Sequence, residues 1–598
     1  MYNGKTVAAV FALGVLLAGV CFAQGLEDNW NDFLHYTKIG RLDLARDYAK
    51  VVLASKPDPV ELLSLSEANP EGYAFLLKAS ETPYDAELAQ LTTKILNIIE
   101  EGKLIRRADP KIIVPEIKRL SSTARARLDA LKHLQNAGEY AITYMLDAIA
   151  DGSRREEWPN IIWALSQIGR DSIRPLAAAM QTKNVAVKTE IIKALGKIGY
   201  PQSLAYLKLV IEKDDSAELR SFARESINQI DPSTLNLSAA QLFYQLAESY
   251  YYHAESLTPA QDVNFANIWF WDSQTGRLTR EKVDKDYFNE LMAMHACEWA
   301  LKADDSFGQA IGLWLAAYLK AESCNIAMPN YFGPGHPEAI VYATTAGPEY
   351  LHQALARAIK DENAYIALGA VEALAVTAGE KSLLYRLGPA QPLVQALSFK
   401  DRAVRYSSAI AIAAAGPKEH FPESKLVVEN LAQAISGTVG QSDGNDTGMW
   451  NEQLANSYAV RAARVMLSLG QTENPVIDLS AAQSTLINAT KDKRPEIQTL
   501  AGQILAHLDS PDAQRSIAAM ALDQNNAMNV RISAFESLAT SAKLNANLLD
   551  SERIDAIYAL VGSQETPPQL RSAAAAAYGA LNLPSQKVKN LILDQAKS

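Results

Sequence analysis

The chain has 598 residues, of which 48% are apolar and 21% are charged, a composition typical of folded soluble protein. Its length predicts about three or four domains, or one long repeat array. The 57 Lys and Arg against 68 Asp and Glu leave a net charge of −11. A surface for nucleic acid or anionic lipid needs a positive field, so we expect neither nucleic acid nor an anionic membrane surface as a partner.

The first 23 residues have the pattern of a secretory signal peptide. Lys5 precedes an uncharged run over 6–23, and the small residues Cys21 and Ala23 occupy the −3 and −1 positions of a cleavage site. We therefore predict a signal peptide over 1–23, cut after Ala23, and a secreted or periplasmic mature protein. The alternative is a retained membrane anchor, because the run approaches the roughly 18 residues that a span needs.

Residues 24–120 are predicted to form an N-terminal helical region. The segment "DFLHYTKIGRLDLARDYAKVVLASKPDP" places Tyr36, Gly40, Ala45, Ala49 and Pro57 at the spacing of a tetratricopeptide repeat, which this segment resembles. The resemblance implies a helix–turn–helix start to the mature chain.

An internal repeat organises much of the remaining chain. An apolar residue and a cation are followed, after five residues, by a small and an aliphatic residue. The frame occurs as Val187, Lys188, Ala194 and Leu195; as Leu219, Arg220, Ser226 and Ile227; as Val404, Arg405, Ala411 and Ile412; as Val530, Arg531, Ser537 and Leu538; and as Leu570, Arg571, Ala577 and Tyr578. A step of seven residues places the apolar and small residues on one helix face, so the frame predicts the buried stripe of an amphipathic helix.

This frame resembles the HEAT repeat family, whose second helix carries a similar ending to "ALSQIG" (164–169) and "ALGKIG" (194–199). The resemblance implies an α-solenoid, in which two-helix units bury their apolar faces by stacking. It predicts one array over 121–232 and a second over 346–598. The frame is broken between Phe421 and Met466, which leaves the number of repeats over 417–470 open. We expect the cation of the frame to pack along a neighbouring turn and meet an acid.

Residues 233–330 are predicted to be a helical insert between the two arrays. Ala293, Ala300 and Tyr318 follow tetratricopeptide spacing, which this segment resembles. Cys297 and Cys324 flank a predicted turn between two helices and would lie roughly 18 Å apart, too far for a disulfide. We expect both to be small buried side chains.

A β-hairpin is predicted within this insert, over about 264–283. Residues 268–273, "IWFWDS", alternate in a period of two, "DSQTG" has the composition of a turn, and Arg277 begins a return strand. A lone hairpin is marginal in water, so one face must pack on helices. Either both tryptophans point inward as a plug, or they point outward as an aromatic platform for a peptide or sugar. The candidate binding residues are Trp269, Phe270, Trp271 and Arg277.

Two irregular segments complete the prediction: a linker over 331–345 and a polar, glycine-rich loop over 436–453. Asp443, Asn445 and Thr447 resemble the start of a calcium loop, but Leu454 stands where a bidentate glutamate is needed. A flexible loop is therefore favoured over a metal site.

The sequence contains no Gly-x-Ser-x-Gly, phosphate loop, His-Glu-x-x-His or Cys-x-x-Cys motif, and we expect no enzyme activity, cofactor or metal. The predicted fold is all-α: two HEAT-like arrays and a helical insert carrying one hairpin. The predicted function is a non-enzymatic extracytoplasmic scaffold or adaptor that binds a protein or peptide on a solenoid surface. Two alternatives remain. One is a self-assembling envelope protein, hence a homo-oligomer; the other is a bilin-lyase-like enzyme, since some HEAT-like relatives are bilin lyases.

Overall fold

The computed structural model describes residues 25–81, 85–259, 263–324, 337–437 and 450–584, together with 586, 589, 592 and 593. The predicted cleavage site after Ala23, most of the loop over 436–453 and part of the linker over 331–345 lie outside the described residues. Within them the chain is an all-α solenoid with one two-stranded sheet, which confirms the predicted fold class. None of the described helices is both long enough and apolar enough to cross a bilayer.

The chain forms two compact units. Unit 1 comprises Met1–Asn236 and Ile268–Arg280, and unit 2 comprises Leu237–Asn267 and Glu281–Ser598. The hairpin consists of β1 (Phe265–Asp272) and β2 (Arg277–Asp284). Its central part therefore belongs to unit 1, although in the sequence it stands between helices of unit 2.

Unit 1 begins with a helical bundle. Its helices are α2 (Leu26–Lys38), α3 (Leu42–Ala54), α4 (Pro59–Ala68), α5 (Pro70–Ser80) and α6 (Ala86–Ala108). Trp30 and Phe33 of α2 are buried in one core with Ala45 and Ala49 of α3. The turn between these helices passes through Gly40, whose φ of 75° is a conformation that suits glycine.

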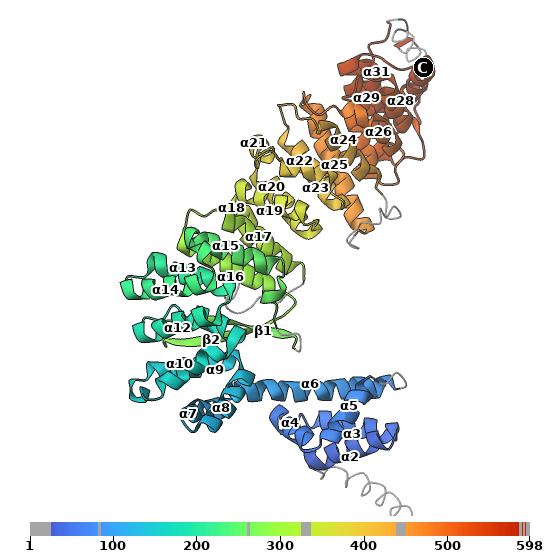
Figure 1. The fold of residues 1–598 in the computed structure, drawn as a ribbon. Coiled ribbons are helices and arrows are strands. Elements are labelled where there is room, and N and C mark those ends of the chain that lie inside the picture. Colours follow the sequence, from blue (N-terminus) through green and yellow to red (C-terminus); the bar gives the residue numbers. More distant parts are fainter. Residues whose placement is uncertain are drawn as a thin grey trace, which may run out of the picture. The chain divides into compact units, whose positions relative to one another are not determined.

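The rest of unit 1 is a stack of helix pairs (Figure 1). Its helices are α7 (Pro110–Arg119), α8 (Ala124–Ala137), α9 (Glu139–Ala150), α10 (Trp158–Gln167), α11 (Ile173–Ala179), α12 (Val185–Ile198), α13 (Leu204–Lys213) and α14 (Ala217–Ile230). Helices α8, α10, α12 and α14 pack on one another in one layer, and α7, α9 and α11 in a second. Small residues permit this closeness: a Cβ on Gly196 of α12 would lie 2.6 Å from the Oγ of Ser226 on α14.

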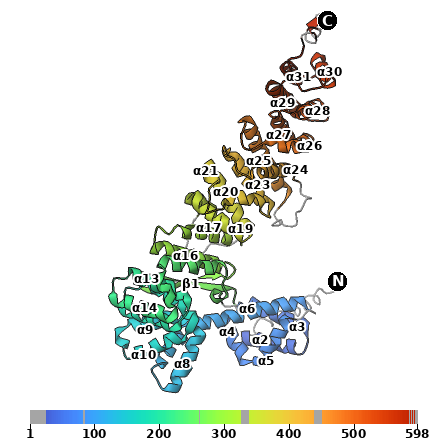
Figure 2. The ribbon, with the colours of Figure 1, turned by 45° about the horizontal axis from the view of Figure 1, so that its top comes forward.

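Unit 2 begins with α15 (Ala239–Tyr251), α16 (Phe288–Ala303) and α17 (Gln309–Glu322) and continues as stacked helices. These are α18 (Ala339–Ala346), α19 (Pro348–Lys360), α20 (Ala364–Thr377), α21 (Glu380–Leu383), α22 (Pro392–Gln395), α23 (Arg402–Ala415), α24 (Ser424–Ser436), α25 (Glu452–Gln471), α26 (Gln483–Ala489), α27 (Pro495–Leu505), α28 (Pro511–Leu522), α29 (Met528–Asn545), α30 (Ser551–Gly562) and α31 (Pro568–Ala580). Helices α23, α25, α27, α29 and α31 form one layer, and α24, α26, α28 and α30 the other (Figure 2). In its described residues, the interrupted segment around 417–470 contributes one helix pair, α24 and α25.

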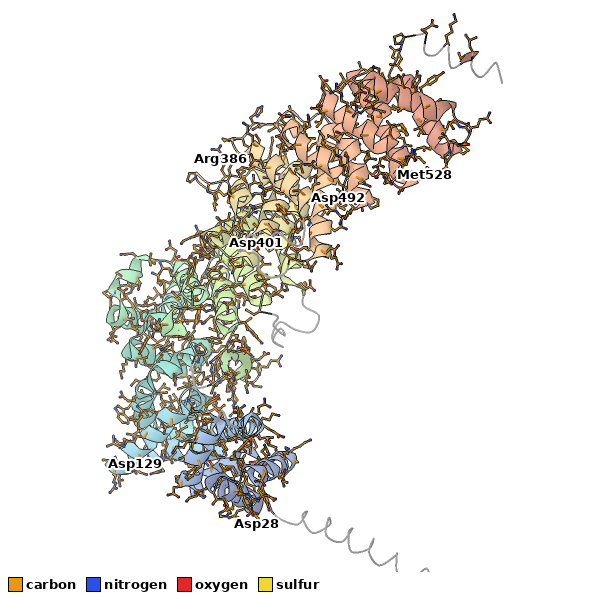
Figure 3. The ribbon with its side chains drawn as sticks, turned by 90° about the vertical axis from the view of Figure 1, so that its right-hand side faces the viewer. Asp28, Asp129, Arg386, Asp401, Asp492 and Met528 are labelled. Atoms are coloured by element: carbon orange, nitrogen blue, oxygen red, sulfur yellow. The ribbon has the colours of Figure 1, made fainter. Side chains whose placement is uncertain are left out.

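Short polar turns separate the helices of unit 2. Asp401, labelled in Figure 3, stands at the start of α23, and its Oδ1 accepts hydrogen bonds from the backbone N–H groups of Ala403 and Val404. Asp492 lies in the turn before α27 and accepts from the backbone N–H of Arg494 at 2.8 Å. Such side chains satisfy backbone donors that a helix start leaves unpaired.

The repeat frame is confirmed as a buried stripe. Every apolar and small position of its five copies is buried, from Val187 in unit 1 to Tyr578 in unit 2. The expectation for the cation is met by Lys188, whose Nζ lies 2.7 Å from Oδ2 of Asp214. Burial opposes ionisation of Asp214, but the hydrogen bond from Lys188 outweighs it and the pKa of this carboxyl is lowered.

Three arginines of the frame donate to backbone carbonyls. Arg220 donates to the carbonyls of Asp214 and Asp215, and Arg531 donates to the carbonyl of Ala521. Arg405 likewise donates to the carbonyls of residues 399 and 400. Arg220 and Arg531 differ from the expectation because the carbonyls at the end of one helix have no partner within that helix, and a guanidinium satisfies them.

The expectation for the cysteines is met by Cys297 and is wrong for Cys324. Neither forms a disulfide; Cys297 is buried in α16, whereas Cys324 is exposed. Cys324 follows the end of α17 at Glu322, beyond the last turn of the helix, so no partner helix covers it.

Candidate functional site

The hairpin carries the four candidate residues, and a tight turn fixes its tip. Asp272 ends β1, and its carboxylate accepts from the Thr275 hydroxyl at 2.6 Å and the Gln274 backbone N–H at 2.8 Å. These hydrogen bonds lower the pKa of Asp272. Gly276 completes the turn with a φ of 67°, a left-handed conformation that favours glycine. The turn therefore presents its flanking side chains in a defined direction.

Trp269 attaches the hairpin to α9 of unit 1. Its side chain is buried, and its indole Nε1–H donates to Oε2 of Glu139 at 2.7 Å. Glu139 also lies 3.4 Å from Nη2 of Arg174. The guanidinium of Arg280 lies over the ring of Tyr140 on α9, at 4.6 Å, and over the Trp269 ring at 5.9 Å. A buried indole with its donor satisfied by a carboxylate is a structural anchor.

Arg277 makes a second attachment to α9. Its Nη2 lies 2.7 Å from Oδ2 of Asp147, and its side chain is 62% exposed. Ion pairs at such exposed positions contribute little to stability. Arg277 therefore positions the start of β2 more than it holds the hairpin in place.

Trp271 and Arg277 line a pocket of about 290 Å³ in unit 1. Its other walls come from α9, where Asp147 contributes, and from the turn before α12, where Lys183 and Asn184 contribute. Trp271 is half-buried there, as is Phe270, which does not line the pocket. The structure thus brings together Trp271 and Arg277, but not Trp269 or Phe270.

The two tryptophans were expected to share one role, and in the structure they differ. Residues 266–269 are all buried, so both faces of β1 are covered there, since successive side chains point to opposite faces. Residues 270–272 are half-buried. Trp269 and Trp271 lie on the same face of β1, so their different burial results from their positions along the strand.

The pocket offers binding groups and no evident reaction chemistry. Lys183 is exposed and forms no ion pair within the ranges that the structure describes. Asn184 uses its Oδ1 to cap α12, accepting from Ala186 and Val187. The described residues hold no group of three or more His, Cys, Asp or Glu side chains arranged to bind a metal. An aromatic surface beside polar groups suits a peptide or another small polar ligand.

A second polar cluster, in unit 2, was missed by sequence reasoning. Glu290 of α16 is buried, and its Oε1 lies 2.5 Å from Nε2 of His253 and 2.9 Å from Nζ of Lys320. Burial opposes ionisation of Glu290, but the hydrogen bond from His253 and the charge of Lys320 outweigh it, so its pKa is lowered. His253 adopts a left-handed φ of 53° just after α15. These residues are 30–67 positions apart in the sequence, so no local sequence motif predicts this cluster.

Arg357 extends this cluster along α15 of the same unit. Its guanidinium donates to the hydroxyls of Tyr244 and Tyr252, at 2.9 and 2.8 Å, and to Oε1 of Glu248 at 2.7 Å. Burial opposes the charge, but these partners outweigh it and raise the pKa of Arg357. These hydrogen bonds join α15 to α19, so we assign Arg357 a structural role.

The stacked two-helix units define an α-solenoid protein. Residues 126–228, within unit 1, match the family model described as HEAT repeats, so this part of the chain is built of HEAT repeats. No curated protein matches the sequence.

Several solved solenoids are similar to the chain. The karyopherin Kap95p bound to RanGDP is 12% identical over 87% of this chain and 69% of its own, with a TM-score of 0.28. Yeast importin-beta is 13% identical over 92% of this chain and 64% of its own, with a TM-score of 0.25. UNC-45 from Drosophila melanogaster is 12% identical over 94% of this chain and 83% of its own, with a TM-score of 0.21.

Proposed function

We propose that this protein is a non-enzymatic adaptor that works outside the cytoplasm and binds a peptide segment of a partner protein in the hairpin pocket of unit 1. The observation that carries the proposal is the position of Trp271, half-buried in a pocket of about 290 Å³ that charged and polar side chains also line. Its location outside the cytoplasm rests on the predicted signal peptide over 1–23.

The pocket is held in a defined shape before any partner arrives. Trp269 fixes β1 to Glu139, Arg277 pairs with Asp147, and the turn is closed by Asp272. A preformed site spends less of its binding free energy on ordering loops. Aromatic side chains in such sites supply a large contact area with few rotatable bonds, which favours peptide recognition.

The charge of the pocket indicates the kind of peptide. Asp147 is already paired with Arg277, whereas Lys183 forms no ion pair with another described residue. The pocket therefore favours a peptide that carries an apolar or aromatic side chain for Trp271 next to an acidic side chain for Lys183.

The test uses peptides selected from a random library against the mature protein. We expect Trp271→Ala to weaken the selected peptides at least tenfold in fluorescence anisotropy. Lys183→Ala should weaken acidic peptides more than their amide counterparts. The matched control is Trp163→Ala, on α10 of the same unit, because Trp163 is 38% exposed and does not line the pocket. Equal losses in Trp271→Ala and Trp163→Ala would contradict the proposed site.

The location is tested separately. The mature protein recovered from the source cells should have its N-terminus at Gln24, next to the predicted cut after Ala23. A mature N-terminus at Met1, with the protein in the cytosolic fraction, would refute this part of the proposal without affecting the pocket.

A further inference from the structure

A second cavity in unit 1 differs from the hairpin pocket in its chemistry. It has a volume of about 460 Å³ and lies among α4, α6, α7 and α8. Its aliphatic wall is formed by Leu63, Ile112, Ile113, Leu134 and Ala137, and none of these residues lines the hairpin pocket. Its size is within the range of small-molecule sites, about 300–1,000 Å³.

Most charged groups around this cavity are neutralised by neighbours. Arg106 donates to both carboxylate oxygens of Glu67, at 3.0 and 2.8 Å. Nζ of Lys103 lies 2.6 Å from Oε1 of Glu100. Glu116 lies 2.8 Å from Nη1 of Arg119, and His133 lies 3.1 Å from the same carboxylate. These groups are therefore poorly placed to attract a charged ligand.

Arg107 is the exception among the cations that line the cavity. Its Nε is buried and has no hydrogen-bond partner, and its guanidinium forms no ion pair with any residue that the structure describes. The carboxylate of Asp171 and the guanidinium of Arg107 both lie beside Gly138. A Cβ on Gly138 would lie 3.0 Å from Oδ2 of Asp171 and 3.4 Å from Nη2 of Arg107. A buried donor without an acceptor costs free energy that a bound acceptor would recover.

We propose that this cavity binds a small amphiphilic monocarboxylate, with its carboxylate on Arg107 and its unbranched alkyl chain on the aliphatic wall, where Ile112 is 41% exposed. A guanidinium pairs with a carboxylate through parallel N–H···O bonds, and one unpaired cation matches one negative charge. A peptide main chain would need several hydrogen-bond partners along the wall, where Asn136 supplies the one amide side chain. An alkyl chain needs none.

The experiment compares octanoate with its neutral analogue octanamide by isothermal titration calorimetry on the full mature chain. We expect octanoate to bind at least tenfold more tightly, because a hydrogen bond to a charged group is stronger than one to a neutral group. Arg107→Met should remove this preference. The matched control Arg125→Met, at an exposed arginine of α8 outside the cavity, should retain it.

A second variant tests the aliphatic wall without depending on Arg107. Ile112 lines the cavity and is 41% exposed, so Ile112→Ser should leave the fold intact and weaken octanoate and octanamide alike. Equal affinity for the two ligands, or an octanoate preference that survives Arg107→Met, would overturn the proposal. Tighter binding of a short peptide with a free C-terminal leucine than of octanoate would overturn the choice of ligand.

Discussion

The substitution Trp269→Phe tests whether the indole hydrogen bond holds the hairpin on α9. Phenylalanine keeps most of the buried ring and removes the Nε1–H that donates to Glu139 at 2.7 Å. A hydrogen bond to a charged group contributes about 1.5–3 kcal/mol. Because Glu139 keeps Arg174 at 3.4 Å, we expect a loss near the lower end of this range, about 1–2 kcal/mol.

Hydrogen exchange measures this loss where it occurs. A solenoid opens locally, so a global melting temperature would report the effect poorly. We expect the amides of residues 268–280 to exchange roughly five- to thirtyfold faster in Trp269→Phe, which corresponds to about 1–2 kcal/mol. Combined with Glu139→Gln in a double-mutant cycle, the two changes should be less than additive. Exchange over 268–280 that stays within twofold of the wild type would refute the anchoring role of this hydrogen bond.

Three further predictions concern other parts of the molecule. Arg277→Ala should lower the stability of the hairpin by less than about 1 kcal/mol in the same exchange measurement, because its pair with Asp147 is exposed; a larger loss would show that the tip is held at this point. Ala411→Arg should lower the free energy of unfolding of unit 2 by about 3 kcal/mol or more, because Ala411 is 2% exposed within α23; an unchanged melting temperature would contradict the repeat frame. The lowered pKa of Glu290 contributes stability that is fully present above the pKa of an unfolded glutamate, about 4.3, and is lost as the pH falls through the lower folded value. As the pH falls from about 5 to about 3, the melting temperature should therefore decrease less steeply in Glu290→Gln than in the wild type. Parallel decreases in the two proteins would refute this linkage.

The repeat architecture could be predicted because its signal is local and recurs. The frame from Val187 to Leu195 needs one helix and one buried face, and both follow from a seven-residue step. The hairpin was predicted over about 264–283 and is observed over Phe265–Asp284, because alternation and a glycine-containing turn are also local signals. Interactions of this kind are encoded within ten to twenty neighbouring residues.

The pocket and the Trp269 anchor beside it could not be predicted, because the residues that meet there come from separate parts of the chain. Trp269 and Glu139 are 130 positions apart, and so are Arg277 and Asp147. Alternation along β1 assigned both tryptophans to one face, but it carried no information on which helices cover that face at each position. The separation of a buried Trp269 from a half-buried Trp271 depends on the tertiary position of α9.

The arginines of the repeat frame have a consequence for how repeat units can be added to such a chain. Arg220 and Arg531 each bind the main chain at the end of the helix that pairs with their own, so the contact lies inside a single two-helix unit. A carbonyl is present whatever side chain stands there, and such a unit can be copied or inserted without a matching change elsewhere. Lys188 differs, since its partner Asp214 belongs to the following unit and must be inherited with it. The contacts of Arg220 and Arg531 therefore place no demand on the side chains of neighbouring units, whereas the pair of Lys188 and Asp214 ties two neighbouring units to each other.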